Sequence, residues 1–184
     1  MTKLAAVTAA LMLLVSCGNF GRVEQGRVIA YDAQARRVTL IPTASGNSPG
    51  TLPPLTIETP TDPNEMGPEP AAGGLMLLDT RARRIVVYDA AQGAFRTIRY
   101  TPLEERRNVS KAPRAPVVDR AKSRITLYAS DTHALVTFGA SPELLALPAD
   151  TWRSGDVVRY YYKDPARALR LMNVTRTDLT KSGG

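Results

Sequence analysis

Few residues in this chain are of a type that carries chemistry. Cys17 is the only cysteine and His133 the only histidine among the 184 residues. One cysteine excludes a disulfide within the chain, and one histidine leaves almost no ligands for a transition-metal site. The composition therefore predicts no metal site and no cofactor.

His133 lies in the run Ser130-Asp131-Thr132-His133, where a hydroxyl, a carboxylate and an imidazole occur together. A hydrolase triad needs such groups to converge from different elements, whereas here they are neighbours in one expected turn. The Gly-x-Ser-x-Gly motif of many hydrolases is also missing from the sequence. We therefore predict no catalytic residues. The alternative is a hydrolase that uses carboxylates such as Asp119 and Asp131.

Three consecutive tyrosines follow Val157-Val158-Arg159 near the C-terminus. Alternate side chains of a strand share a face, so Tyr160 and Tyr162 should face the same way as Val158, and Tyr161 the other way. An aromatic pair of this kind could bind a sugar or a peptide, which makes Tyr160 and Tyr162 a candidate ligand-binding surface. Ordinary packing of the rings inside a barrel is the alternative.

Cys17 follows a segment that has the three parts of a secretory signal. Lys3 supplies the positive region, residues 4–15 are predominantly apolar, and Ser16 is a small residue at the expected cleavage point. We therefore expect residues 1–16 to be a signal peptide.

The run Leu14-Val15-Ser16-Cys17 also resembles the bacterial lipoprotein signal. In that signal the thiol receives diacylglycerol, and the new amine receives an acyl chain such as palmitate. We therefore expect Cys17 to be the lipidated first residue of a tether over 17–25. Gly18 stands where an aspartate would favour the inner membrane, so we expect the outer membrane, facing the periplasm. An ordinary cleaved signal with a free cysteine is the alternative.

The chain carries a surplus of basic side chains. Removing residues 1–16 takes one lysine and no acid from 24 basic and 17 acidic side chains, which leaves a balance of +6. A basic surface beside a membrane attracts anionic groups within about 8 to 10 Å. Besides the membrane itself, we expect an envelope protein or an anionic envelope polymer as partner, with solvated strand faces as the alternative. Export and the lack of a basic-aromatic motif argue against nucleic acid.

Short β-branched and aromatic runs separated by turn residues dominate the rest of the chain and predict strands. Asp32, Asp79 and Asp119 each come six residues before the β-branched residue that begins a new strand. An aspartate in this position can accept backbone hydrogen bonds and begin a turn, so the pattern predicts hairpins. Ser141-Pro142 predicts one short helical turn. The strand runs are VIAY, VTLI, LTI, IVVY, ITLY, LVTF and VVRYYY.

The strand runs of the two halves can be aligned in order, which suggests a diverged duplication. Five short antiparallel strands suit a small barrel of the OB or SH3-like type. We therefore predict an all-β fold of two tandem barrels of five to six strands, over 26–101 and 116–177. The linker is expected at 102–115, a proline-rich arm at 42–73 with one strand inside it, and a tail at 178–184. One continuous β-sandwich is the alternative.

Several phrases of the sequence resemble an uncharacterised lipoprotein family, a domain of unknown function from sulfate-reducing bacteria. The resemblance implies an exported bacterial lipoprotein, but it brings no activity and no functional residues. We expect a lipid-anchored periplasmic lipoprotein that acts as a non-enzymatic binding or envelope-structural module, with a periplasmic enzyme as the alternative. The phrases are GRVEQGRVIAYD, DPNEMGPEPAAGGLMLLDT, FRTIRYTPLEERRNVSK, PVVDR, LPADTWRSGDVVRYYYKD and ALRLMNVTRTDL.

Overall fold

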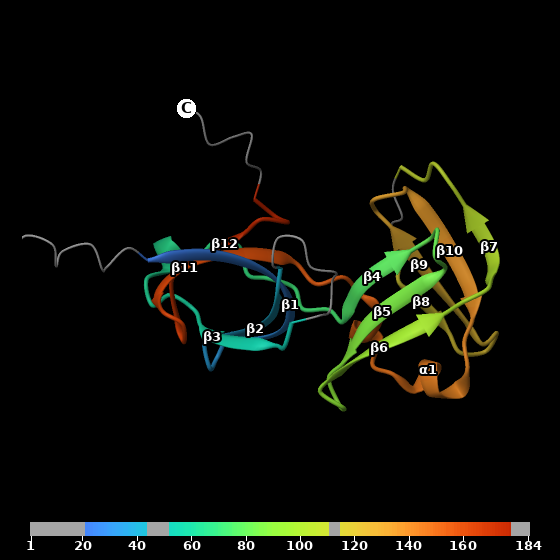
Figure 1. The fold of residues 1–184 in the computed structure, drawn as a ribbon, viewed down its shortest axis with the longest axis horizontal. Helices are drawn as coiled ribbons and strands as arrows, with labels where there is room; N and C mark the ends of the chain where they lie inside the picture. The colour runs from blue at the N-terminus through green and yellow to red at the C-terminus, as the bar shows by residue number, and fades with distance from the viewer. Residues whose placement is uncertain (1–20, 44–51, 111–114, 178–184) are drawn as a thin grey trace, which may run out of the picture.

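The computed structural model describes residues 21–43, 52–110 and 115–177. The fold is all-β, as the sequence predicts, with one short α-helix (Figure 1). Among these residues, none of the helices has the length and apolar character needed to cross a membrane. In chain order the elements are β1 (Arg22–Asp32), β2 (Arg37–Pro42), β3 (Leu55–Glu58), η1 (Pro63–Glu65), β4 (Leu75–Asp79), β5 (Arg84–Asp89), β6 (Ala94–Arg99), β7 (Pro102–Arg106), β8 (Val117–Asp119), β9 (Arg124–Ala129), β10 (Ala134–Gly139), α1 (Pro142–Ala146), η2 (Ala149–Trp152), β11 (Val157–Asp164) and β12 (Arg167–Asn173).

Hairpin turns of one kind connect many of the neighbouring strands. The aspartate that ends β1, β4, β5 or β8 accepts hydrogen bonds of 2.8 to 3.3 Å from backbone N–H groups two or three residues ahead. The last residue of each turn adopts a positive φ, which the return strand of such a hairpin requires. The turns predicted at Asp32, Asp79 and Asp119 are therefore confirmed, and Asp89 begins another. In these four turns the positive-φ residues are Arg36, Arg83, Gly93 and Ser123, and His133 ends the turn between β9 and β10 in the same conformation.

Strands from both ends of the described chain form a closed barrel, in the order β1-β11-β12-β3-β2. β1 pairs antiparallel with β2 on one edge and with β11 on the other. The ring closes where Arg167 of β12 lies beside Glu58 of β3 in a short parallel contact. Closure leaves these strands without open edges. The barrel core contains Val28, Val38, Leu40, Ile57, Val158, Tyr160, Tyr162, Ala168 and Leu171.

The residues between the two parts of the barrel form a sandwich of two sheets, β4-β5-β6 and β7-β10-β9-β8. Both sheets contribute to one core, which Trp152 from η2 and two leucines of α1 complete. Ser141 and Pro142 occupy the N-cap and first positions of α1, as predicted, although the Ser141 hydroxyl makes no capping bond. The core contains Leu75, Leu78, Ile85, Val87, Tyr100, Ile125, Leu127, Ala129, Ala134, Val136, Phe138, Ala140, Leu147 and Trp152.

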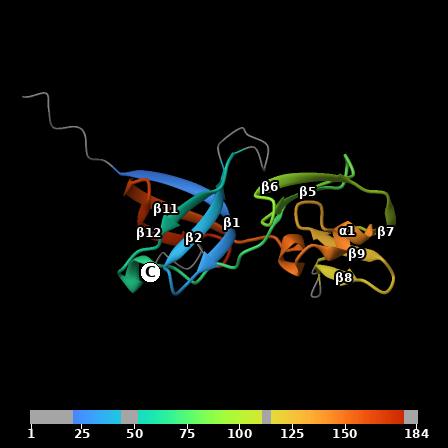
Figure 2. The same cartoon turned by 90° about the horizontal axis from the view of Figure 1, so that it is seen from below.

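The barrel and the sandwich lie side by side and are joined by two crossing segments, one before β4 and one after η2 (Figure 2). A small apolar cluster lies between them, in which Ile41 of β2 packs with Met76 and Val86 of the sandwich. The outer face of the β4-β5-β6 sheet therefore rests on the outside of the barrel.

The predicted tandem arrangement is not confirmed. β11 and β12, expected in a second barrel over 116–177, complete the barrel that β1, β2 and β3 begin. β7, inside the expected linker at 102–115, pairs with β10 of the sandwich. The alternative prediction, one continuous β-sandwich, is not observed either, because only the middle of the described chain forms a sandwich. The physical reason is that turn residues specify which neighbouring strands form hairpins. The strand that pairs with the other edge of each strand is distant in the sequence, and local residues do not specify it.

Candidate functional site

A cavity of about 480 Å³ lies where the barrel meets the sandwich. Its walls come from β1, β4, β9, the turn after β9, the residues just before β8, and η2 with the segment that follows it. Small-molecule sites in proteins have volumes of about 300 to 1,000 Å³, mostly apolar walls and a few polar groups. The cavity has a volume in this range, but its exposed lining is about equally polar and apolar. Its apolar lining includes Leu75, Leu77, Leu78, Leu127, Ala129 and Trp152, and its polar lining includes Arg27, Asp131, Arg153 and Ser154.

A bulge in β4 lets this strand serve both the sandwich and the barrel. The register between β4 and β5 shifts between Leu75 and Leu77. As a result, Leu75 and Leu78 belong to the sandwich core, while Met76 and Leu77 pack toward the barrel. An extra residue in one strand re-aims the side chains that follow it. The bulge therefore places β4 along the wall of the cavity.

Arg27 is the barrel residue in the cavity wall. It follows Gly26 and precedes the buried Val28, so its side chain leaves β1 on the outer face of the barrel. Its Nη1 donates hydrogen bonds to Ser154 Oγ at 2.5 Å and to the Gly155 carbonyl oxygen at 2.9 Å. Burial lowers the pKa of the Arg27 guanidinium, and the nearby charge of Asp156 opposes that shift. The guanidinium is thus partly desolvated, and both acceptors it contacts are neutral.

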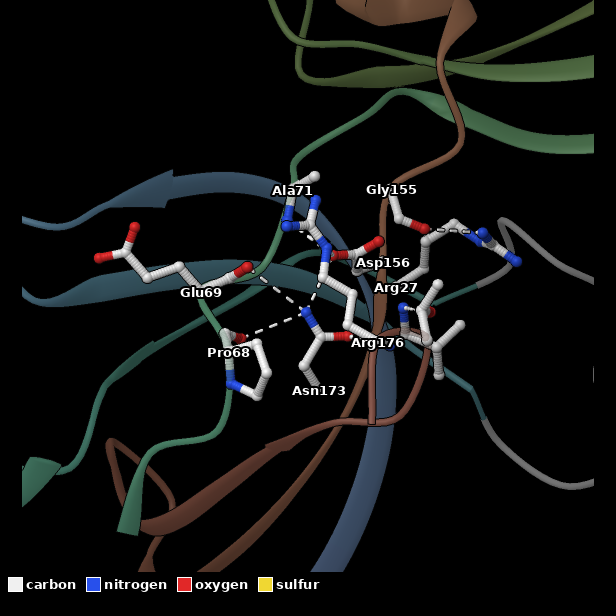
Figure 3. Close-up of polar contacts among 10 residues, drawn as sticks. Arg27, Pro68, Glu69, Ala71, Gly155, Asp156, Asn173 and Arg176 are labelled. Carbon is white, nitrogen blue, oxygen red and sulfur yellow. Dashed lines mark hydrogen bonds and ion pairs between the residues drawn. The ribbon is translucent and has the colours of Figure 1, made fainter. Parts of the chain in front are cut away.

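Asp156 and Asn173 fix the crossing segments to the barrel (Figure 3). Asp156 Oδ2 accepts from the Ala71 backbone nitrogen at 2.9 Å and from Asn173 Nδ2 at 2.9 Å, and pairs with Arg176 Nε at 2.7 Å. Asn173 Nδ2 also reaches the Pro68 carbonyl oxygen at 3.3 Å, and its Oδ1 accepts from the Arg176 backbone nitrogen at 3.2 Å. A buried carboxylate is tolerated when donors satisfy it in this way. The network holds the segment that carries Ser154 and Gly155, and through them Arg27.

Two glycines allow the crossing segments to lie directly against β1. The Gly73 backbone nitrogen donates to the Val28 carbonyl oxygen at 3.1 Å, and the Val28 nitrogen donates to the Asp156 carbonyl oxygen at 2.9 Å. A Cβ on Gly155 would collide with the Val28 carbonyl oxygen, and one on Gly73 would collide with the Arg153 carbonyl oxygen. A larger side chain at either position would force the segments apart.

Tyr160 and Tyr162 point into the barrel. Their side chains are 1% and 7% exposed, and the rings stack with centroids 5.5 Å apart. The shared face with Val158 is as predicted, but that face is the barrel interior, so the rings do not form the exposed surface expected for a ligand. Both hydroxyls donate to Glu24, at 2.9 Å from Tyr160 and 2.6 Å from Tyr162. Burial raises the pKa of Tyr160, and the hydrogen bond to Glu24 raises the pKa of Tyr162.

Asp119, Asp131 and His133 have separate environments. Asp119 Oδ1 accepts from the Lys122 backbone nitrogen at 3.0 Å, Asp131 borders the cavity, and His133 Nδ1 lies 3.1 Å from the Tyr128 hydroxyl. Within the ranges that the structure covers, no hydrogen bond joins any two of the three. In those same ranges, no group of three or more His, Cys, Asp or Glu side chains could hold a metal ion.

Sequence reasoning missed Arg27, Trp152, Asp156 and Asn173. Trp152 had one signal, since it is the only tryptophan of the chain. Asp156 had a weaker signal in its neighbour Gly155, because glycine is favoured where two backbone segments approach closely. Cys17, the predicted lipidation site, lies outside the described residues.

Comparison with known proteins identifies a family for the chain but no similar individual protein. A search of curated proteins and a search of solved structures each found no significant match. A family model matches residues 19–182, which is nearly the whole chain. The chain therefore belongs to the family described as domain of unknown function DUF4881.

Proposed function

We propose that this protein is a lipid-anchored bacterial lipoprotein that faces the periplasm and acts as a non-enzymatic binding module. The observation that carries the proposal is the cavity of about 480 Å³ between barrel and sandwich, which is lined by both apolar and polar side chains and includes a partly desolvated arginine. Such a cavity fits a small ligand better than a catalytic site, because its polar residues offer no nucleophile paired with a base.

The anchor is lipid on Cys17, in the outer membrane. A lipoprotein signal directs several acyl chains to such a cysteine, and each buried methylene contributes about 0.8 kcal/mol to membrane binding. The resemblance of the sequence to lipoproteins of sulfate-reducing bacteria supports the same location.

Labelling with palmitate in a bacterial host tests the anchor. The wild-type protein should incorporate label and sediment with outer membranes after density separation, and Cys17→Ala should do neither. Label retained by the Cys17→Ala variant would contradict lipidation at this residue.

Filling the cavity tests the binding function. Ser130 is exposed and lines the cavity, whereas Ser110 is exposed and does not, so Ser130→Phe and Ser110→Phe form a matched pair. The neutral apolar dye Nile red should bind wild type and Ser110→Phe equally, and Ser130→Phe at least about tenfold more weakly. Equal binding by all three would contradict the cavity as ligand site.

An envelope protein or an anionic envelope polymer is the partner class that we propose outside the cavity. The support is the side-chain balance of +6 that remains after residue 16. Unlipidated protein should bind vesicles that contain anionic lipid, and binding should fall as salt is raised because salt screens surface charge. Binding unchanged from low to high salt would contradict electrostatic attachment.

A further inference from the structure

We propose that the cavity takes an anionic amphiphile, which is a molecule with one carboxylate or phosphate head group and an apolar body. The inference rests on the binding function proposed above and names the chemical class of the ligand. Arg27 would hold the head group, and the apolar wall beside Leu77 would hold the body.

Among the described residues, no ion pair balances the charge of Arg27. Its two hydrogen bonds go to a hydroxyl and a carbonyl, both from Nη1. No carboxylate of the described chain lies within ion-pair distance of it, whereas Asp156, the acid that influences its pKa, is paired with Arg176. Among the described residues, the Nε and Nη2 donors of Arg27 have no acceptor, yet they are not sealed from solvent. These donors can bind two oxygens of a carboxylate or of a phosphate.

The other charged residues of the cavity are consistent with a preference for an anionic ligand. Arg153 adds a second guanidinium, whose ion pair with Asp150 is 3.5 Å long and exposed, and exposed pairs of this kind are weak. Asp131 is the one acid of the lining, and it is exposed in the turn between β9 and β10. Two cations and one exposed acid give the cavity a net attraction for anions.

Part of the cavity lining is apolar. Leu75, Leu78 and Trp152 are at most 7% exposed and back the cavity, and Leu77 is half-buried at its wall. An alkyl chain along this lining would cover the exposed surface of Leu77, whereas the three buried residues add little, and each Å² of apolar surface removed from water contributes about 25 cal/mol. A small inorganic anion would leave the wall uncovered, so the structure favours an amphiphile over free phosphate.

Trp152 reports on binding without a label, because it is the only tryptophan and lines the cavity. The protein to use is the mature chain with Cys17→Ser, so that no attached acyl chain competes. Four probes separate the sources of affinity: dodecanoate, dodecyl phosphate, the neutral dodecanol and inorganic phosphate, each below its micelle-forming concentration. Dodecanoate and dodecyl phosphate should change Trp152 emission at about tenfold lower concentration than dodecanol. Inorganic phosphate should bind more weakly still.

Variants then assign the head group to Arg27. Arg27→Gln should weaken dodecanoate at least about tenfold and leave dodecanol within about twofold. Arg27→Lys keeps the charge but not the paired donors of the guanidinium, so it should restore only part of the affinity. Arg159→Gln, at an exposed barrel arginine outside this cavity, should change nothing.

Three results would overturn the inference. If dodecanol bound as tightly as dodecanoate, or if Arg27→Gln bound dodecanoate as wild type does, recognition of an anionic head group by Arg27 would be contradicted. The binding function of the cavity would still stand. If inorganic phosphate bound as tightly as the amphiphiles, the claim that the ligand has an apolar body would be contradicted. If no probe bound, amphiphiles and Nile red alike, the proposed function itself would fail. The comparison of dodecanoate with dodecanol uses protein that keeps Arg27. It therefore tests the preference for an anionic head group even if Arg27→Gln does not fold.

Discussion

Asn173 ends β12 with its side chain fully buried, and it connects the barrel to both crossing segments. Its sequence context did not predict this, because the partners of its amide nitrogen, Pro68 and Asp156, lie 105 and 17 residues away along the chain. The turn aspartates were predictable because each one bonds to backbone only two or three residues away. At the residue scale, local hydrogen bonds could be foreseen and distant ones could not.

Replacement of Asn173 should therefore be costly. Asn173→Ala removes one donor from Asp156 and one of the two acceptors of the Arg176 backbone nitrogen, which also donates to the Asn173 carbonyl oxygen at 3.3 Å. We expect a loss of about 2 to 3 kcal/mol in the free energy of unfolding, measured by urea denaturation. Asn64→Ala, at an exposed asparagine, is the control and should cost about 0.5 kcal/mol or less. Equal losses in the two variants would show that the buried network contributes no special stability.

The tyrosine pair in the barrel predicts a loss of stability at alkaline pH. Folding raises the pKa of Tyr160 above its ordinary value near 10, so the unfolded chain loses this proton at a lower pH than the folded chain. The stabilisation is complete below about pH 10 and falls as pH rises further. In Tyr160→Phe, the free energy of unfolding should start lower, through loss of the bond to Glu24, and decline less steeply above pH 10. The same slope in wild type and variant would refute this explanation.

At the scale of elements, the sequence identified most strands and hairpins but not their partners. The run Leu55–Glu58 forms a strand as expected, and the turns at Asp32, Asp79 and Asp119 form as expected. The far edge of β1 pairs with β11, more than a hundred residues later, and no local signal specifies that contact. A repeated pattern of hairpins fits tandem barrels and the observed fold equally well.

The crossing segments make a sharp prediction at this scale. Gly155→Ala would drive a methyl group into the Val28 carbonyl oxygen, so we expect a loss of about 3 kcal/mol or more in the free energy of unfolding. Gly139→Ala is the matched control, because nothing lies within 4 Å of the added carbon. It should change stability by about 0.5 kcal/mol or less. A small effect at Gly155 would mean that the segments are not packed against β1.

At the scale of the whole molecule, the cavity exists because the sandwich is inserted between the two parts of the barrel. Its lining comes from β1, β4, β9 and the segment after η2, which are brought together only by this insertion. For that reason the candidate site could not be predicted from motifs. Lipidation at Cys17 stays a prediction, since its signal is entirely local and lies outside the described residues.

Mapping of amide signals by solution NMR tests the binding function of the cavity most directly. Dodecanoate is added to the mature chain with Cys17→Ser, uniformly labelled with nitrogen-15. We predict that the largest shifts fall on the Trp152 indole and on the amides of Leu77, Ser130 and Ser154, which line the cavity, with little change at Tyr160 in the barrel core. Shifts centred on the barrel around Glu24 and Tyr160, or no shifts at all, would contradict a ligand site between the barrel and the sandwich.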